Sequence, residues 1–351
     1  MEAEVLSPSE LTERQKHTLE LIIKHYIETG HPVSSKSLVS LLGVSSATIR
    51  NDMGVLEETG YISSPHTSAG RVPTEKGYRY FVQHLLDDDQ LTAVERRTIA
   101  HQFHQAPLDL EQWMRLAAAV LSRTARSASL VTAPYSKINR FKHLELIATQ
   151  GRMVLMVLVL HNGEVRQRML TLAEPISQER LSETAARLTQ LALGLTAQQL
   201  RAKLYGLNAL EEEVLSLVIT LIEQESDRPQ LVYRDGLAEL LSRFGESEGA
   251  QQALRVLEEQ TLLEDLINEA NPSIGNIRVL IAGEGRWDNI SLLSIVLGRY
   301  GVAGQATGTL GVLGPTRMSY GRAISAVRYM SDLMSTLMVG IYGGDTESSG
   351  A

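Results

Sequence analysis

The sequence predicts an α+β protein of two or three domains that begins with a winged helix-turn-helix. Its 351 residues exceed the size of one typical domain. Three helical apolar patterns and a turn-rich loop follow one another within residues 12–86. Beyond residue 126, strand-like segments stand at both ends of a long helical block. This order favours one sheet domain that is interrupted by a helical insertion.

The bulk composition is typical of a folded protein. Hydrophobic residues make up 43% of the chain and charged residues 21%, which argues against wholesale disorder. The chain has no cysteine, so disulfides, thiolate zinc sites and cysteine nucleophiles are excluded. Residues 1–10 lack the pattern of a signal peptide, and the longest apolar run, 153–160, is too short to span a bilayer as a helix. We therefore expect a cytoplasmic protein with no membrane partner.

Capping and turn residues predict the elements of the winged helix in order. Thr12 and Gln15 form a capping-box pattern at the start of a helix over 12–29. Ser34 is expected to cap a short second helix, and Gly43 provides a tight turn. The third helix opens at Ser45 and is expected to stop at Gly60. A short strand, a turn-rich loop and a helix capped by Thr74 complete the domain.

The rest of the chain alternates helical and strand patterns. Two helices are expected within residues 91–126, separated near Pro107. The continuously apolar run 153–160 predicts a central strand, and Asn162–Gly163 predicts a hairpin turn that pairs it with 164–172. Further strands are expected at 130–131, 144–148, 277–282 and 304–313, and helices at 177–226, 248–270 and from Thr316 onward.

The third helix of the winged helix carries a polar face suited to the major groove of double-stranded DNA. Arginine can pair bidentately with guanine and asparagine with adenine, while serine and threonine suit phosphates. The opposite face, with Ile49 and Met53, is expected to pack on the first two helices. The candidate groove residues are Ser45, Ser46, Thr48, Arg50 and Asn51, and the candidate wing residues are His66, Thr67, Ser68, Arg71 and Lys76.

Net charge and pattern leave other interpretations open. The formal charge of −8 argues against a nucleic-acid binder, so any DNA binding has to come from local placement of cations. In the alternative to DNA binding, Ser45 is an ordinary helix cap in a three-helix bundle and Arg50 is a solvated charge.

His101 and His104 lie three apart but lack a third ligand, which favours a solvated helix face over a metal site. The glycine-rich run 298–314 lacks a P-loop lysine and favours a hairpin packed against a helix. No catalytic arrangement is apparent, so neither an enzyme nor a cofactor is expected.

Two long segments resemble the family of heat-inducible transcription repressors called HrcA. The first runs through Val44–Met53, Leu56–Tyr61 and Pro65–Tyr80, and the second is Gly308–Tyr320. The segment 236–241 also fits, whereas the turn at 282–287 and the linker 241–248 depart from the family pattern. The resemblance implies a winged helix (1–88), a GAF-like domain (89–175 with 229–342), a dimerising insertion (176–228) and a disordered tail (343–351).

The resemblance also implies a function. Members of the family repress chaperone genes, namely chaperonin and DnaK-system operons, by binding an inverted-repeat operator as homodimers. Chaperonin is expected to keep the repressor active, and heat stress to relieve repression. Two alternatives remain: a small-molecule-responsive regulator whose GAF-like domain is the ligand sensor, and an interaction module whose winged helix binds protein.

Overall fold

The structure is a computed structural model that describes residues 11–65, 70–86, 91–107, 109–136, 138–226, 231–244, 248–270, 272–282 and 290–342. The chain divides into two compact units. The first unit comprises Met1–Val131, Tyr233–Arg299 and Thr309–Asp332, and the second comprises Thr132–Val232, Tyr300–Gly308 and Leu333–Ala351. The expected wing residues His66, Thr67 and Ser68, the atypical turn at 283–287 and the expected disordered tail lie outside the described residues.

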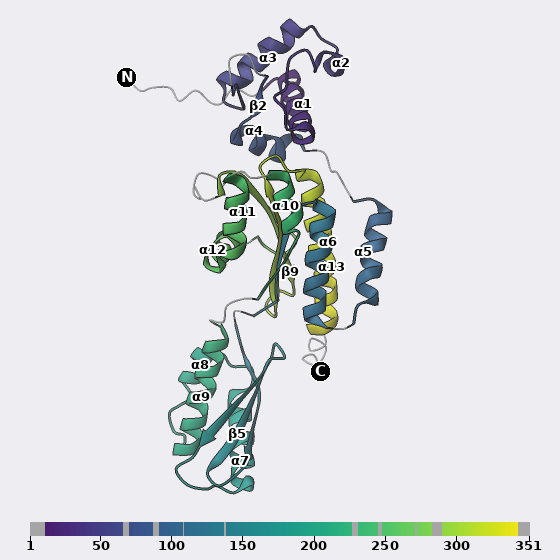
Figure 1. Cartoon of the computed structure of the whole chain (residues 1–351). Coiled ribbons are helices and arrows are strands. Elements are labelled where there is room, and N and C mark those ends of the chain that lie inside the picture. The colour runs from purple at the N-terminus through teal and green to yellow at the C-terminus, as the bar shows by residue number, and fades with distance from the viewer. Residues whose placement is uncertain are drawn as a thin grey trace, which may run out of the picture. The chain divides into compact units, whose positions relative to one another are not determined.

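The three-helix core at the N-terminus confirms the predicted winged helix (Figure 1). Helix α1 (Glu13–Thr29) begins at Thr12 with the expected capping box and ends at Gly30, whose φ is 70°. Helix α3 (Ser46–Glu58) begins at Ser45 as expected. Helix α2 (Val39–Leu42) is shorter than expected and has no side-chain cap. The hydroxyl of Ser34 accepts from the backbone N–H of Ser37, so it caps a turn before the helix.

Buried apolar side chains hold this domain together. Leu19, Ile22 and Ile23 of α1 and Ile49 and Leu56 of α3 have no exposed surface. Strands β1 (Ile62–Ser63) and β2 (Val72–Pro73) pair antiparallel to form the base of the wing. Helix α4 (Glu75–Tyr80) starts at the predicted cap Thr74 and continues into the π-helical turn η1 (Phe81–Leu85).

Strands from both sides of the small second sheet's sequence form a five-stranded sheet with the order β7-β3-β10-β9-β8. In Figure 1, α6 and α13 lie on one side of this sheet, and α11 and α12 lie on the other. The predicted break at Pro107 separates α5 from α6. Strand β7 and helix α10 were not predicted, and the single helix expected over 248–270 is two helices. The bounds are α5 Ala93–Gln105, α6 Leu110–Ala125, β3 Ala128–Thr132, β7 Val232–Asp235, α10 Leu237–Phe244, α11 Glu248–Glu258, α12 Gln260–Ala270, β8 Ile277–Ile281, β9 Leu293–Gly301, β10 Thr307–Pro315 and α13 Tyr320–Tyr342.

Glycines allow close approach of the backbone in the sheet, as the glycine-rich run predicted. A Cβ atom on Gly311 of β10 would lie 2.3 Å from the carbonyl oxygen of Val296 on the neighbouring strand β9. A Cβ atom on Gly298 would lie 2.4 Å from the hydroxyl of Ser331 on α13. Both distances are far below van der Waals contact. The predicted hairpin that packs closely against a helix is therefore confirmed.

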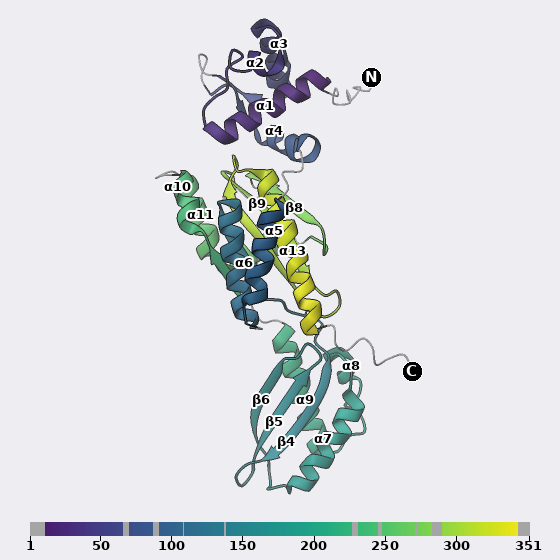
Figure 2. The ribbon, with the colours of Figure 1, turned by 90° about the vertical axis from the view of Figure 1, so that its right-hand side faces the viewer.

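The second unit contains a separate three-stranded antiparallel sheet with the order β4-β5-β6 (Figure 2). The predicted hairpin at Asn162–Gly163 is confirmed, because Val159 pairs with Val165 across it. One hydrophobic cluster joins the strands to the helices. The expectation of a single sheet was therefore wrong, and residues 176–228 share their core with strands that begin at Phe141. The bounds are β4 Phe141–Ala148, β5 Met153–Leu160, β6 Val165–Thr171, α7 Gln178–Ala192, α8 Ala197–Arg201 and α9 Ala209–Ser226.

The apolar run 153–160 forms the central strand of the small sheet, as its composition predicted. Its burial alternates along the strand, because Val154, Met156 and Leu158 face the helices while Val157 and Val159 lie on the opposite face. Within the described residues, no helix is both long and apolar enough to cross a membrane.

Candidate nucleic-acid interface

Helix α3 has one buried face and one exposed polar face. Ile49, Met53 and Leu56 are buried, whereas Arg50 and Asn51 are exposed. This division follows from the helical period, since residues three or four positions apart, such as Ile49, Met53 and Leu56, share one face, while the two residues that follow Ile49 lie on the other. Of the side chains that sequence analysis placed in the groove, Ser45, Arg50 and Asn51 are therefore exposed to a ligand, while Ser46 and Thr48 are half-buried. An arginine buried at position 50 would have ruled out this arrangement.

Hydroxyl groups order the first turn of α3. The Ser45 hydroxyl accepts from the backbone N–H of Thr48 at 3.2 Å and lies 2.9 Å from the Thr48 hydroxyl. The Ser46 hydroxyl lies 2.9 Å from that of Ser35, which precedes α2. The N-terminal turn that would approach a phosphate is thus held by the segment before α2.

Ser35 also positions the side chain of Arg50. The Nε–H of Arg50 donates to the Ser35 hydroxyl at 3.4 Å, a long bond that restrains the guanidinium from one side. This contact uses only Nε, so the two terminal amino groups remain available for the two acceptors of a guanine edge. Sequence analysis did not identify Ser35. Its only signal is its place in the polar run Ser34–Ser37.

A buried carboxylate fixes α3 to α1. Asp52 is 3% exposed and accepts two hydrogen bonds from Arg14, at 2.7 Å from Nε and 3.1 Å from Nη2. These hydrogen bonds, and then the charge of Asp52, raise the pKa of the Arg14 guanidinium. The pair neutralises an acid that directly follows Asn51. Sequence analysis missed Asp52, although its place three residues after Ile49 and four before Leu56 puts it on the buried face.

The two described wing cations, Arg71 and Lys76, contact the C-terminal end of α3. Arg71 forms an ion pair with Glu57 at 2.8 Å and donates to the Ser64 hydroxyl at 2.9 Å. Lys76 donates to the carbonyl oxygen of Thr59 at 2.7 Å, and its ammonium lies 4.5 Å from the centre of the Tyr61 ring. These contacts attach the wing to α3. A role of Arg71 and Lys76 at the DNA backbone stays a prediction.

Ion pairing explains how an acidic chain can present positive charge locally. Within the winged helix, acidic side chains pair with nearby bases: Glu13 with Lys16, Glu20 with Lys24 and Glu75 with Arg79. Among the described residues of this domain, the exposed Lys36 and Arg50 have no carboxylate partner. Both belong to the helix-turn-helix, so each can present its charge to a DNA phosphate. Lys36 is not among the residues that the sequence placed at the site, because it precedes α2 and not the third helix.

The second segment of the resemblance contacts the winged helix within the first unit. Tyr320 is buried, and its hydroxyl donates to the carbonyl oxygen of Thr316 at 2.7 Å. Its ring lies 5.9 Å from that of Tyr78 in α4, and burial raises the pKa of both phenols. Arg317 approaches Gly30 so closely that a Cβ atom there would lie 2.4 Å from Nη1. Two segments far apart in sequence therefore meet at the base of the DNA-binding domain.

Comparisons with known proteins agree with this geometry. The profile of the winged helix-turn-helix of HrcA repressors matches residues 10–86, and the profile of the HrcA C-terminal domain matches residues 111–324. Heat-inducible transcription repressor HrcA of Roseiflexus castenholzii is 44% identical over 96% of this chain and 98% of that relative. The relative of the same name from Thermomicrobium roseum is 39% identical over 97% of this chain and 99% of its own length.

A solved structure covers the same length. The crystal structure of a hypothetical protein aligns with 94% of this chain and 99% of its own, with a TM-score of 0.60 and 26% identity. Both domain profiles and the full-length relatives point to one family. The chain belongs to the family of heat-inducible transcription repressors HrcA.

Proposed function

We propose that the protein is a cytoplasmic, sequence-specific repressor of heat-shock chaperone genes, those of the chaperonin and DnaK-system operons. It binds an inverted-repeat operator as a homodimer. The observation that carries this proposal is the exposure of Arg50 and Asn51 on a helix whose opposite face is fixed by the Arg14–Asp52 pair. A rigid helix with an exposed arginine and asparagine has the chemistry that reads base edges in the major groove.

The proposed contacts divide by chemistry. Arg50 and Asn51 reach guanine and adenine, while the hydroxyls of Ser45, Ser46 and Thr48 lie at the helix N-terminus, where phosphate oxygens are favoured. The remaining proposed contacts come from the wing: His66, Thr67, Ser68, Arg71 and Lys76.

An apolar face of the small sheet supports the proposed homodimer. On the face opposite α7, the pairs Ile147–Leu155 and Leu155–Met169 lie side by side across the three strands. Ile147 is 43% exposed and Met169 48%, although both are large and apolar. A second copy can cover this face about a twofold axis, because an isologous contact places the same patch on both subunits. The interface is thus proposed on the strands that precede residues 176–228.

The heat response is proposed to act through the folded state of the repressor. A domain is stable by only about 5–15 kcal/mol, so heating can populate forms that no longer hold α3 in place. Chaperonin returns such forms to the operator-binding state. When unfolded proteins occupy the chaperonin under heat stress, repression is lifted.

Fluorescence anisotropy with the promoter of the organism's own chaperone genes tests the proposal. The full chain is expected to bind the inverted repeat far more tightly than a scrambled duplex, with two chains per site. After a heat pulse, chaperonin is expected to restore this affinity. Equal affinity for the two duplexes would contradict sequence-specific repression. If operator affinity recovers equally with and without chaperonin, only the proposed regulation would be contradicted.

A further inference from the structure

We propose that the second unit contains a binding site for a small phosphate monoester that carries a hydroxyl group. A pocket of about 400 Å³ lies within this unit, in the size range of small-molecule sites, about 300–1,000 Å³. Its lining comes from the segment that leads into β4, the β5–β6 turn, the β9–β10 turn and the end of α13. None of these residues belongs to the DNA interface.

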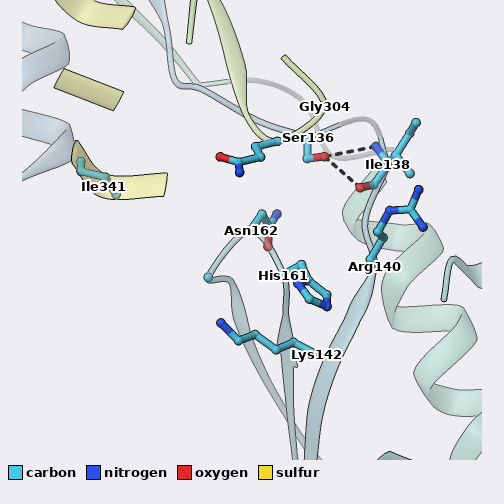
Figure 3. A pocket seen from close by; sticks show the side chains of 10 residues that line it. Ser136, Ile138, Arg140, Lys142, His161, Asn162, Gly304 and Ile341 are labelled. Carbon is cyan, nitrogen blue, oxygen red and sulfur yellow. Dashed lines mark hydrogen bonds between the residues drawn. The ribbon is translucent and has the colours of Figure 1, made fainter. Parts of the chain in front are cut away.

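The charge of the lining favours an anion. Arg140, Lys142 and His161 all line the pocket, and none of the described lining residues is aspartate or glutamate. Nη1 of Arg140 donates to the carbonyl oxygen of Gly194 at 2.9 Å, which holds the guanidinium in place and leaves its other N–H groups for a ligand. Figure 3 shows these three side chains on neighbouring segments, below Ser136 and Gly304. A doubly charged phosphate matches the two cations Arg140 and Lys142 better than a monoanion does.

One polar group of the lining lacks a hydrogen-bond partner. The Oε1 atom of Gln305 is buried and accepts no hydrogen bond from any described residue. The other amide and hydroxyl groups are satisfied, since Asn162 donates to Asn139 at 3.1 Å and Ser136 donates to the carbonyl oxygen of Ile138 at 2.9 Å. A buried acceptor without a donor costs free energy. A hydroxyl group on the ligand supplies the missing donor.

The lining also has an apolar part. Ile138 and Ile341 line the pocket and are 57% and 47% exposed, and Figure 3 places them on opposite sides of it. The carbon atoms that join the phosphate of the ligand to its hydroxyl can cover these side chains. An organic phosphate is therefore expected to bind more tightly than inorganic phosphate, because inorganic phosphate contacts only the cations and not the apolar side chains.

Isothermal titration calorimetry on the full chain tests the site with glycerol 3-phosphate, inorganic phosphate and glycerol as probes. We expect saturable binding of glycerol 3-phosphate with one site per chain, weaker binding of inorganic phosphate and none of glycerol. The substitution Lys142→Gln is expected to weaken the binding of glycerol 3-phosphate about tenfold or more, since the phosphate loses a hydrogen bond to a charged group. Lys142 is exposed, so the change leaves the core intact.

Two further variants separate this site from general charge effects. Lys203→Gln removes an exposed lysine of the same unit that does not line the pocket, and it is expected to leave binding unchanged. Gln305→Leu is expected to reduce the ratio of the affinity for glycerol 3-phosphate to the affinity for inorganic phosphate. Absence of saturable binding, or equal affinity of the Lys142→Gln and Lys203→Gln variants, would overturn the proposal. Operator binding by the winged helix is measured in a separate experiment, so the outcome of the calorimetry does not decide the proposed function.

Discussion

The guanidinium of Arg14 in α1 donates two hydrogen bonds, 2.7 and 3.1 Å long, to the carboxylate of Asp52 in α3. Asp52 lies on the buried face of the helix, one residue after the exposed Asn51. The orientation of the proposed reading helix is therefore set by an ion pair as well as by apolar packing.

Removal of this carboxylate is expected to destabilise the winged helix. Asp52→Ala should lower the free energy of unfolding by about 1.5–3 kcal/mol, the range for hydrogen bonds to charged groups, because Arg14 loses its partner. Urea denaturation followed by circular dichroism measures this change. Glu13→Ala, which breaks the exposed pair with Lys16, is the control and should cost at most about 1 kcal/mol. Equal losses in the two variants would refute the structural role of Asp52.

Loss of the reading side chains is expected to weaken operator binding without loss of stability. Arg50→Ala and Asn51→Ala should each cost about 1–3 kcal/mol of binding free energy and relax the preference for one base pair. Anisotropy titrations with duplexes altered at single positions measure both effects. The matched control is Arg97→Ala, which removes an exposed arginine of α5. An Arg50→Ala variant that binds like the control would remove Arg50 from the list of contacts.

Lys36 is expected to act on the DNA backbone. As an exposed cation without a carboxylate partner among the described residues, it can neutralise one phosphate. Lys36→Ala should weaken binding to operator and scrambled duplexes by a similar factor. It should also make the negative slope of log affinity against log salt concentration less steep by about 1. Titrations at several salt concentrations give this slope. If only the operator complex weakens, Lys36 contacts a base instead.

Two glycines of the winged helix are expected to respond oppositely to alanine. At Gly77 a Cβ atom would lie 2.1 Å from the carbonyl oxygen of Tyr61, so Gly77→Ala forces the wing away from α4 and destabilises the domain. At Gly54 nothing lies within 4 Å, so Gly54→Ala should stabilise α3 by about 0.5–1 kcal/mol through helix propensity. Thermal denaturation of the two variants measures both. A Gly77→Ala variant as stable as the wild type would show that the backbone there can move.

The pair between Glu95 and Arg322 is expected to make stability depend on pH. The hydrogen bond from Arg322, followed by those from the backbone N–H and hydroxyl of Thr92, lowers the pKa of Glu95 to about 2. Because the pKa is lowered in the folded state, the contribution of Glu95 is full above its ordinary pKa of 4.5 and is lost as the pH falls to about 2.

The comparison of wild type with Glu95→Gln isolates this contribution. The variant should be less stable than the wild type at pH 7, and the difference should shrink as the pH falls through that window. Urea denaturation at a series of pH values measures the difference. In an Arg322→Ala background the effect of Glu95→Gln should be much smaller. A difference that stays constant with pH would show that the pair does not hold Glu95 ionised.

Much of the winged helix could be predicted from its sequence because its signals are local. The capping box at Thr12, the cap at Ser45 and the left-handed glycines at 30 and 43 act within a few residues of themselves. The exposed face of α3 follows from the same helical period. Burial of Ile49 places Arg50 and Asn51 outside the core.

Other parts depend on contacts between distant segments. Strand β7 is short and mixed in composition, and only pairing with β3 gives it a place in the sheet. The apolar run of β5 predicted a central strand, but its sequence does not say which sheet it enters. In the structure its apolar side chains share a core with α7 and α9, so the second sheet is separate from the first.

The sequence by itself determined the order of the elements, the caps and turns that bound them and the polar face of α3, because these depend on neighbours within one or two helical turns. Tertiary structure alone decided that Asp52 pairs with Arg14, that Arg71 and Lys76 turn towards α3, and that Gln305 and Lys142 line the same pocket. Each of these arrangements brings together residues that are far apart in the sequence, because burial and charge select partners that sequence spacing does not reveal.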